Sequence, residues 1–364
     1  MPPSSEPIEA VSQRLDNFLS DQLSFAASLG PEAETMTRAG AAALQGGKRL
    51  RARFCISGWR AVEEHRRPAP AALIPALVAV AASLEVFHAA ALVHDDIIDN
   101  SDTRRGQPAA HRALEAAHRA AGWATDPAAF GRSGAVLLGD LLVAWSDDLL
   151  EEGLTDAAAT AAATRRHYAH MRRDVTIGQF LDVAEESAYV VHPDGDHADR
   201  ALRVASYKSA RYSIQQPLQI GAALAGAEGD QLDALGRFGH DVGMAFQLRD
   251  DVLGVFGDTA VTGKPSGDDL REGKRTVLVA YARERLDAGA RRTVDELLGD
   301  PDLDAAQIAA LQRTIVDTGA LARTEELIAE YARRADRALS GARLGDAAVN
   351  ELRELARAAT QRTS

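Results

Sequence analysis

The stretch LEVFHAAALVHDDIIDNSD, residues 84–102, sets the expectation for the whole chain. Its first ten residues are almost wholly apolar, and a cluster of three carboxylates follows them, Asp95, Asp96 and Asp99, before the stretch ends at Asp102. On a helix, Asp95 and Asp99 share one face because they are four residues apart. Like charges this close repel, and burial increases the repulsion, so the cluster needs a cation. Carboxylate oxygens suit Mg²⁺ or Mn²⁺, which makes this helix end a candidate metal site; the alternative is an ordinary acidic helix end on the surface.

A second acidic pair occurs far along the chain, in FQLRDDVLG at residues 246–254. Gln247, Asp250 and Asp251 stand at positions i, i+3 and i+4 of a predicted apolar helix, so they also share a face. If the two pairs face each other across a cavity, they would hold metal ions that bind a diphosphate. Mg²⁺ in proteins is bound through a few carboxylates plus phosphate oxygens.

Cations for a second anion are grouped in GGKRLRARF, residues 46–54, and in TRRG, residues 103–106. Lys48 and Arg51 share a helix face, and the two glycines before them allow a backbone to approach an anion closely. His88 lies two turns before Asp95, where a lone histidine is more often a core residue. Further cations and a hydroxyl that suit a diphosphate lie later in the chain: Lys208, Ser209, Lys264 and Lys274.

Elsewhere the sequence is dominated by strong helix formers, and apolar residues recur at spacings of three and four. We find no run of alternating β-branched residues, so we predict an all-α fold. No shift in composition marks a domain boundary, and we therefore expect an irregular tail over residues 1–8 and one domain over residues 9–364. The glycine-rich segment 257–276 is expected to be a lid or binding loop.

Charge and cysteine content exclude several classes of protein. The chain has 41 basic and 53 acidic residues, a formal net charge of −12, which argues against nucleic-acid binding and against attachment to anionic lipid. Its one cysteine, Cys55, is expected to be a buried thiol of a protein from a reducing, cytoplasmic compartment. We expect no signal peptide and no transmembrane segment, because no uncharged apolar stretch of about 18 residues is present.

Taken together, these blocks resemble the trans-isoprenyl diphosphate synthases, also called polyprenyl synthetases. They occur in order between residues 46 and 276: GGKRLR, EVFHAAALVHDDIID, DTRRG, GQFLD, KSARYS, FQLRDD, GK and GKRT. The resemblance implies an isoprenoid synthase helical bundle around a deep central cavity, usually in a homodimer. It also implies head-to-tail condensation of isopentenyl diphosphate with an allylic diphosphate.

The resemblance implies roles for individual residues. Three Mg²⁺ ions, for which Mn²⁺ can substitute, would be bound with the diphosphate by Asp95, Asp96, Asp99, Asp250 and Asp251. Isopentenyl diphosphate would be held by Lys48, Arg51, His88 and Arg105. The allylic diphosphate would be held by Arg104, Lys208, Ser209, Gln247, Lys264 and Lys274, with Gln179 and Asp182 lining the site near Lys208.

The sequence departs from the family pattern at Gly254, where many members have a third aspartate, and this puts one metal contact in doubt. Asp268 and Asp269 either orient the lysines of the following loop or are solvated loop charges. Both alternatives stay open from the sequence.

Product length is predicted from Ala90, which stands at the position where a bulky aromatic residue stops growth at farnesyl in the family. Ala91 is also small, and Phe87 is the next candidate floor. We therefore predict geranylgeranyl diphosphate, with farnesyl or longer polyprenyl products as alternatives.

Two other functions fit the sequence less well. If the chain were a class I terpene cyclase, GGKRLR would be unexplained, and the Asn-Ser-Glu type motif that such a cyclase needs is absent here. A non-catalytic subunit of a heteromeric synthase usually loses the acidic motifs, whereas this chain keeps both.

Overall fold

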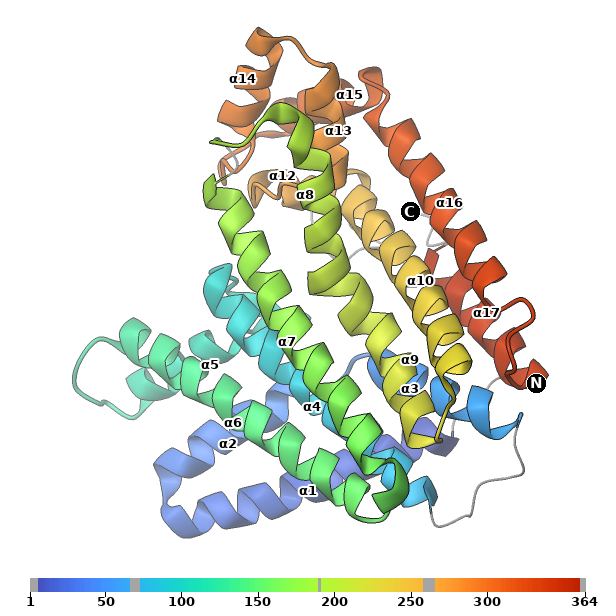
Figure 1. The fold of residues 1–364 in the computed structure, drawn as a ribbon. Coiled ribbons are helices and arrows are strands. Elements are labelled where there is room, and N and C mark those ends of the chain that lie inside the picture. Colours follow the sequence, from blue (N-terminus) through green and yellow to red (C-terminus); the bar gives the residue numbers. More distant parts are fainter. Residues whose placement is uncertain (1–5, 66–72, 189–190, 258–265, 361–364) are drawn as a thin grey trace. The chain divides into compact units, whose positions relative to one another are not determined.

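The computed structural model describes residues 6–65, 73–188, 191–257 and 266–360 (Figure 1). This described part is helical apart from one short hairpin, which confirms the predicted all-α fold. The chain divides into two compact units, residues 1–59 with 67–164 and residues 60–66 with 165–364. Each unit is described by itself. That residues 9–364 form one domain stays a prediction. That the two acidic pairs face each other across a cavity also stays a prediction.

The first unit is organised around α4, whose sequence is apolar on all sides and which packs along α6 and against α1. A helix that is hydrophobic all round is buried in a protein core. The lone thiol of Cys55 is also fully buried, as predicted. The elements of this unit are α1 (Glu6–Leu29), α2 (Pro31–Ala43), α3 (Leu50–Glu63) as far as residue 59, α4 (Leu73–Ile98), β1 (Thr103–Arg104), β2 (Gln107–Pro108), α5 (Ala110–Ala120), α6 (Pro127–Thr155) and the start of α7 (Ala158–Ala188).

The N-terminal residues of this unit are helical earlier than expected. Because α1 begins at Glu6, residues 6–8 are helical, and the predicted tail was wrong for them.

Two of the described helices, α4 and α6, are long and apolar enough to cross a membrane. In α4, 83% of the apolar window is buried inside the structure, whereas in α6 the share is 33%. The apolar side chains of α4 therefore belong to the core, and the absence of a transmembrane segment stays a prediction.

A β-hairpin that the sequence did not predict follows α4. Thr103 pairs with Pro108 and Arg104 with Gln107 in an antiparallel ladder. The two turn residues, Arg105 and Gly106, have φ angles of 53° and 75°. Two consecutive positive φ angles are typical of a type I′ turn, whose twist matches that of the flanking strands. The hairpin thus presents Arg104 on a strand and Arg105 in the turn.

The second unit is built around α10, which runs beside α16 and packs against η3 (Figure 1). Its η3 segment is a π-helix, a rare conformation that often occurs at functional sites, and it carries Lys208 and Ser209. The elements are the rest of α3 and α7, η2 (Asp194–Asp196), α8 (His197–Val204), η3 (Ala205–Gln215), α9 (Gln216–Leu224), α10 (Gly229–Phe256), α12 (Asp268–Arg271), α13 (Val277–Arg285), α14 (Ala288–Leu297), α15 (Ala305–Asp317), α16 (Ala320–Ala338) and α17 (Asp346–Thr360).

Candidate functional site

The first acidic cluster lies at the carboxyl end of α4. Asp95 and Asp99 are one turn apart, with the backbone N–H of Asp99 donating to the carbonyl of Asp95 at 2.8 Å. Asp96 is different, because it is 3% exposed and accepts a hydrogen bond from Arg104 Nε at 2.9 Å. Burial opposes the charge of Arg104, but the hydrogen bond to Asp96 and the neighbouring carboxylates outweigh it and raise the pKa of Arg104. The hairpin therefore holds a charged guanidinium directly beside the cluster.

The end of α4 is held in place by α6. His94 Nε2 donates to the carbonyl oxygen of Val136 at 3.2 Å and lies 3.7 Å from Asp140 Oδ1. A Cβ placed on Gly139 would overlap the His94 ring, so only glycine allows this approach. The close packing fixes the residue that directly precedes Asp95.

A group of cations surrounds His88 in the same unit. Burial lowers the pKa of His88 well below its ordinary value, and the charges of Arg51, Arg105, Arg104 and Arg49 lower it further. The imidazole is therefore neutral at pH 7. Several guanidinium groups around one neutral imidazole form a site that suits a polyanion such as a diphosphate.

Two loops shape this cationic group. Gly46, Gly47 and Arg49 have φ angles of 70°, 85° and 50°, so the chain turns sharply just before α3. Arg105 Nη1 donates to the carbonyl oxygen of Gln45 at 2.8 Å, and Arg105 Nη2 would lie 3.1 Å from a Cβ on Gly47. The glycine pair thus makes room for Arg105, while Lys48 is exposed beside it.

A buried acid that sequence reasoning missed supports these loops. Glu85 Oε1 accepts a hydrogen bond from the backbone N–H of Ala52 at 3.0 Å, and Glu85 Oε2 lies 3.9 Å from Arg49 Nη1. The sequence signal that could have revealed Glu85 is a charged residue inside an apolar helix, three residues before His88.

The second acidic cluster lies near the carboxyl end of α10. Gln247 Nε2 donates to Asp251 Oδ1 at 2.8 Å, and Asp250 is partly buried beside them. Burial raises the pKa of Asp251 to about 8, with a further contribution from the charge of Asp269. Asp269 Oδ1 lies 2.9 Å from Lys274 Nζ. Of the two alternatives left open for Asp269, orientation of a lysine is thus the one that the contacts favour.

Lys274 is charged in this position. Burial opposes its charge, but the carboxylates of Asp269 and Glu272 outweigh burial and raise the pKa of Lys274 above its ordinary value. Lys264, the other lysine predicted for this segment, lies outside the described residues.

Lys208 on η3 forms an ion pair with Asp182 on α7. Gln179 and Ser209 are partly buried on the same two elements. Burial and the charge of Asp182 raise the pKa of Glu186, whereas Lys208 and Lys274 both lower it. Two lysines that are distant in sequence therefore both act on one acidic residue of the second unit, Glu186. Glu186 was missed, although it stands four residues after Asp182 on the same helix face.

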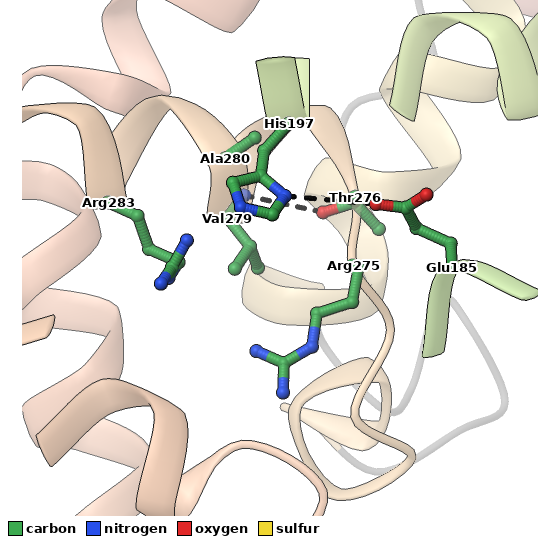
Figure 2. Close-up of a pocket in the computed structure, with 7 residues that line it drawn as sticks. All are labelled: Glu185, His197, Arg275, Thr276, Val279, Ala280 and Arg283. Carbon is green, nitrogen blue, oxygen red and sulfur yellow. Dashed lines mark hydrogen bonds and ion pairs between the residues drawn. The ribbon is translucent and has the colours of Figure 1, made fainter. Parts of the chain in front are cut away.

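A small pocket lies where the chain leaves Lys274 and enters α13 (Figure 2). The charged side chains that line it have ion-pair partners: His197 Nδ1 lies 3.8 Å from Glu185 Oε1, and Glu185 also pairs with Arg200 outside the pocket. Arg275 and Arg283 both pair with Asp295. We interpret the pocket as the support that fixes the GKRT segment.

The donor groups of both clusters fit Mg²⁺. Among the described residues, no three acidic, histidine or cysteine side chains converge closely enough to hold an ion by themselves. Each cluster offers carboxylate oxygens with cations beside them, and Mg²⁺ in such sites completes its coordination with phosphate oxygens.

Comparison with known proteins identifies the family. The model of the family described as polyprenyl synthetase matches residues 33–315. The chain is 34% identical over 315 residues to the geranylfarnesyl diphosphate synthase of Aeropyrum pernix, covering 85% of this chain and 88% of that protein. It is 30% identical over 286 residues to the geranylgeranyl diphosphate synthase of Methanosarcina mazei. That alignment covers 79% of this chain and 77% of the relative.

A solved structure agrees with this result. The crystal structure of a geranylgeranyl pyrophosphate synthase from Corynebacterium glutamicum, complexed with isoprenyl diphosphate and magnesium, is similar with a TM-score of 0.89. The two chains are 39% identical, and 99% of each is covered. Because the family model covers most of the sequence and the relatives are prenyl diphosphate synthases, the chain belongs to the polyprenyl synthetase family and is a trans-prenyltransferase.

Proposed function

We propose that this transferase makes all-trans geranylgeranyl diphosphate from isopentenyl diphosphate and an allylic diphosphate, with Mg²⁺ as its cofactor and Mn²⁺ as a substitute. The observation that carries the proposal is the pairing, in each unit, of a carboxylate cluster with charged Arg or Lys side chains. Polyprenyl synthetases bind isopentenyl and allylic diphosphates. Similar structures hold isoprenyl diphosphate with magnesium or with calcium, which supports a divalent metal.

The contacts refine the predicted roles. Asp95, Asp99, Asp250 and Asp251 would hold three Mg²⁺ ions together with diphosphate oxygens. We assign Asp96 a different role from the one predicted, because its carboxylate is buried against Arg104 and positions that guanidinium. The diphosphate ligands are assigned as predicted from the sequence: Lys48, Arg51, His88 and Arg105 for isopentenyl diphosphate, and Arg104, Lys208, Ser209, Gln247, Lys264 and Lys274 for the allylic substrate, with Gln179 and Asp182 near Lys208.

The reaction would proceed by ionisation, condensation and elimination. When bound, Mg²⁺ would neutralise the allylic diphosphate and make it a better leaving group. Arg104, Lys208 and Lys274 would stabilise the negative charge that develops as the C–O bond breaks. The double bond of isopentenyl diphosphate would then attack the allylic cation, which forms the new C–C bond and leaves a carbocation on the isopentenyl unit. Loss of a proton from that unit to the departed diphosphate would form the new C=C double bond. Buried apolar side chains would keep water from the cation.

The product length is proposed from α4. Ala90 is buried and Ala91 partly buried, so the positions five and four residues before Asp95 carry only methyl groups. Phe87, 6% exposed, lies about one turn earlier than Ala90 and Ala91 and is the next candidate floor. The geranylgeranyl and geranylfarnesyl synthases among the relatives support a product longer than farnesyl.

We also propose that the enzyme is a cytoplasmic homodimer. In the first unit, two apolar side chains of α6 are exposed to solvent: Val136 is 45% exposed and Leu137 is 60% exposed. In the second unit, α7 exposes Ile177, Phe180 and Val183 at spacings of three, and Phe180 is 70% exposed. Exposed apolar residues grouped on one helix often mark a protein–protein interface, and a second copy would cover them.

The test is turnover of labelled isopentenyl diphosphate with dimethylallyl, geranyl or farnesyl diphosphate and Mg²⁺, followed by chromatography of the dephosphorylated products. We expect geranylgeraniol as the main product. Asp95→Ala and Asp99→Ala should lower turnover by orders of magnitude, whereas Asp148→Ala, an exposed acid on α6, should not. Near-normal turnover in either of the first two variants would refute the metal assignment. Size-exclusion chromatography with light scattering tests the dimer.

A further inference from the structure

The second acidic cluster lacks a carboxylate at Gly254, four residues after Asp250 on the same face of α10. The space that a side chain would take there is already filled. A Cβ placed on Gly254 would overlap the carboxylate of Asp269, which comes from α12. The φ angle of Gly254 lies outside the positive range, so the backbone does not require glycine. The requirement at this position is therefore space for Asp269.

Asp269 is held beside the cluster by contacts with Lys274. It is 9% exposed, its Oδ1 lies 2.9 Å from Lys274 Nζ, and its carbonyl oxygen accepts the backbone N–H of Lys274 at 3.1 Å. The charge of Asp269 also raises the pKa of Asp251. α12 packs directly against α10, which brings these groups together.

We propose that Asp269 supplies the carboxylate that Gly254 lacks, and that the pair Gly254–Asp269 replaces a third aspartate on α10. Asp269 would then act as a positioning residue for the metal–diphosphate site, since it adds negative charge beside Asp251 and fixes Lys274. This inference rests on the proposed function, because it concerns the same metal site. It predicts that the two positions are coupled: a side chain at 254 is harmful only while the carboxylate at 269 is present.

The test measures Mg²⁺ binding directly, by calorimetric titration of the purified enzyme in the presence of inorganic pyrophosphate. Residues that orient metal ligands typically change metal affinity by about 10- to 100-fold when mutated. We therefore expect Asp269→Asn and Gly254→Ala each to raise the Mg²⁺ dissociation constant by roughly tenfold or more. Asp268→Asn, which removes the adjacent carboxylate on α12, is the matched control and should leave binding unchanged. Circular dichroism of each variant checks that it is folded.

The exchange variant gives the sharpest result. Gly254→Asp alone should bind Mg²⁺ poorly, because the new side chain displaces Asp269. Gly254→Asp combined with Asp269→Ala moves the carboxylate back onto α10 and should recover binding. Failure of the double variant to bind better than Gly254→Asp would overturn the proposal.

A second comparison separates a direct effect on the cluster from an effect through Lys274. If Asp269→Asn weakens Mg²⁺ binding in a Lys274→Met background as well, Asp269 acts on the cluster. If it has no further effect there, the proposal is wrong and Asp269 only holds the lysine. Absence of Mg²⁺ binding by the unmodified enzyme would instead contradict the proposed function itself.

Discussion

Replacing Gly178 with alanine should damage catalysis far more than it damages folding. Gly178 lies on α7, one residue before Gln179, where the backbone of η3 approaches closely. A Cβ on Gly178 would lie 2.5 Å from the carbonyl carbon of Tyr207 and 2.8 Å from Cα of Lys208. Because these are backbone atoms, no side-chain rotation relieves the overlap. Ordinary contact between carbon atoms requires about 3.5 Å, so the two helices must separate by about 1 Å.

The magnitudes follow from this separation. Overpacking of a core costs about 1–3 kcal/mol, and the higher helix propensity of alanine returns about 1 kcal/mol, which leaves a loss of up to about 2 kcal/mol. Lys208 moves with the η3 backbone, and a misplacement of about 1 Å at a reacting site can lower the rate by on the order of a hundredfold.

The assay compares kcat/KM for the allylic substrate with the free energy of unfolding in urea. Gly229→Ala is the matched control, since Gly229 begins α10 with no atom near its missing Cβ. It should leave both quantities close to those of the unmodified enzyme. If Gly178→Ala kept full activity, the close approach of α7 to Lys208 would not matter for catalysis and the reasoning would be refuted.

Three further perturbations test separate parts of the site. Arg104→Gln leaves the buried carboxylate of Asp96 without its cation, so the free energy of unfolding in urea should fall by about 3 kcal/mol, and a much smaller change would show that Asp96 has other support. In the metal-free enzyme, burial raises the pKa of Asp251 to about 8, so the folded chain keeps a proton that the unfolded chain loses above about pH 4. The free energy of unfolding should therefore decrease as pH rises from about 4 to 8, and Asp251→Asn should flatten this decrease when urea curves are compared across the range. Ala90→Phe should shorten the main product to farnesyl diphosphate, and an unchanged product distribution would place the floor of the chain pocket on other residues.

The parts of the fold and site that were predictable depend on local sequence spacing. Helical periodicity gave the all-α class, and the i, i+4 spacing placed Asp95 and Asp99 on one face. The hairpin at residues 103–108 was not predicted, because each strand is two residues long and Arg105 is not a residue type that favours a positive φ. The pairing of Asp96 with Arg104 was hidden as well, because it needs a turn at the end of α4, where Asn100 has a φ angle of 51°.

The remaining contacts share a physical feature that explains why sequence alone does not reveal them. Arg105 packs on Gly47, the backbone at Lys208 packs on Gly178, and Asp269 packs on Gly254. In each case a charged residue predicted for the site, or found beside it, approaches a glycine from a different element. A glycine in a sequence shows that a side chain is missing but not which distant group uses the space. The functional partners of such glycines are therefore visible only in the folded structure. The variants at positions 178 and 254 measure the same effect at two of these contacts: added volume at the glycine should lower function by moving the charged group that packs there.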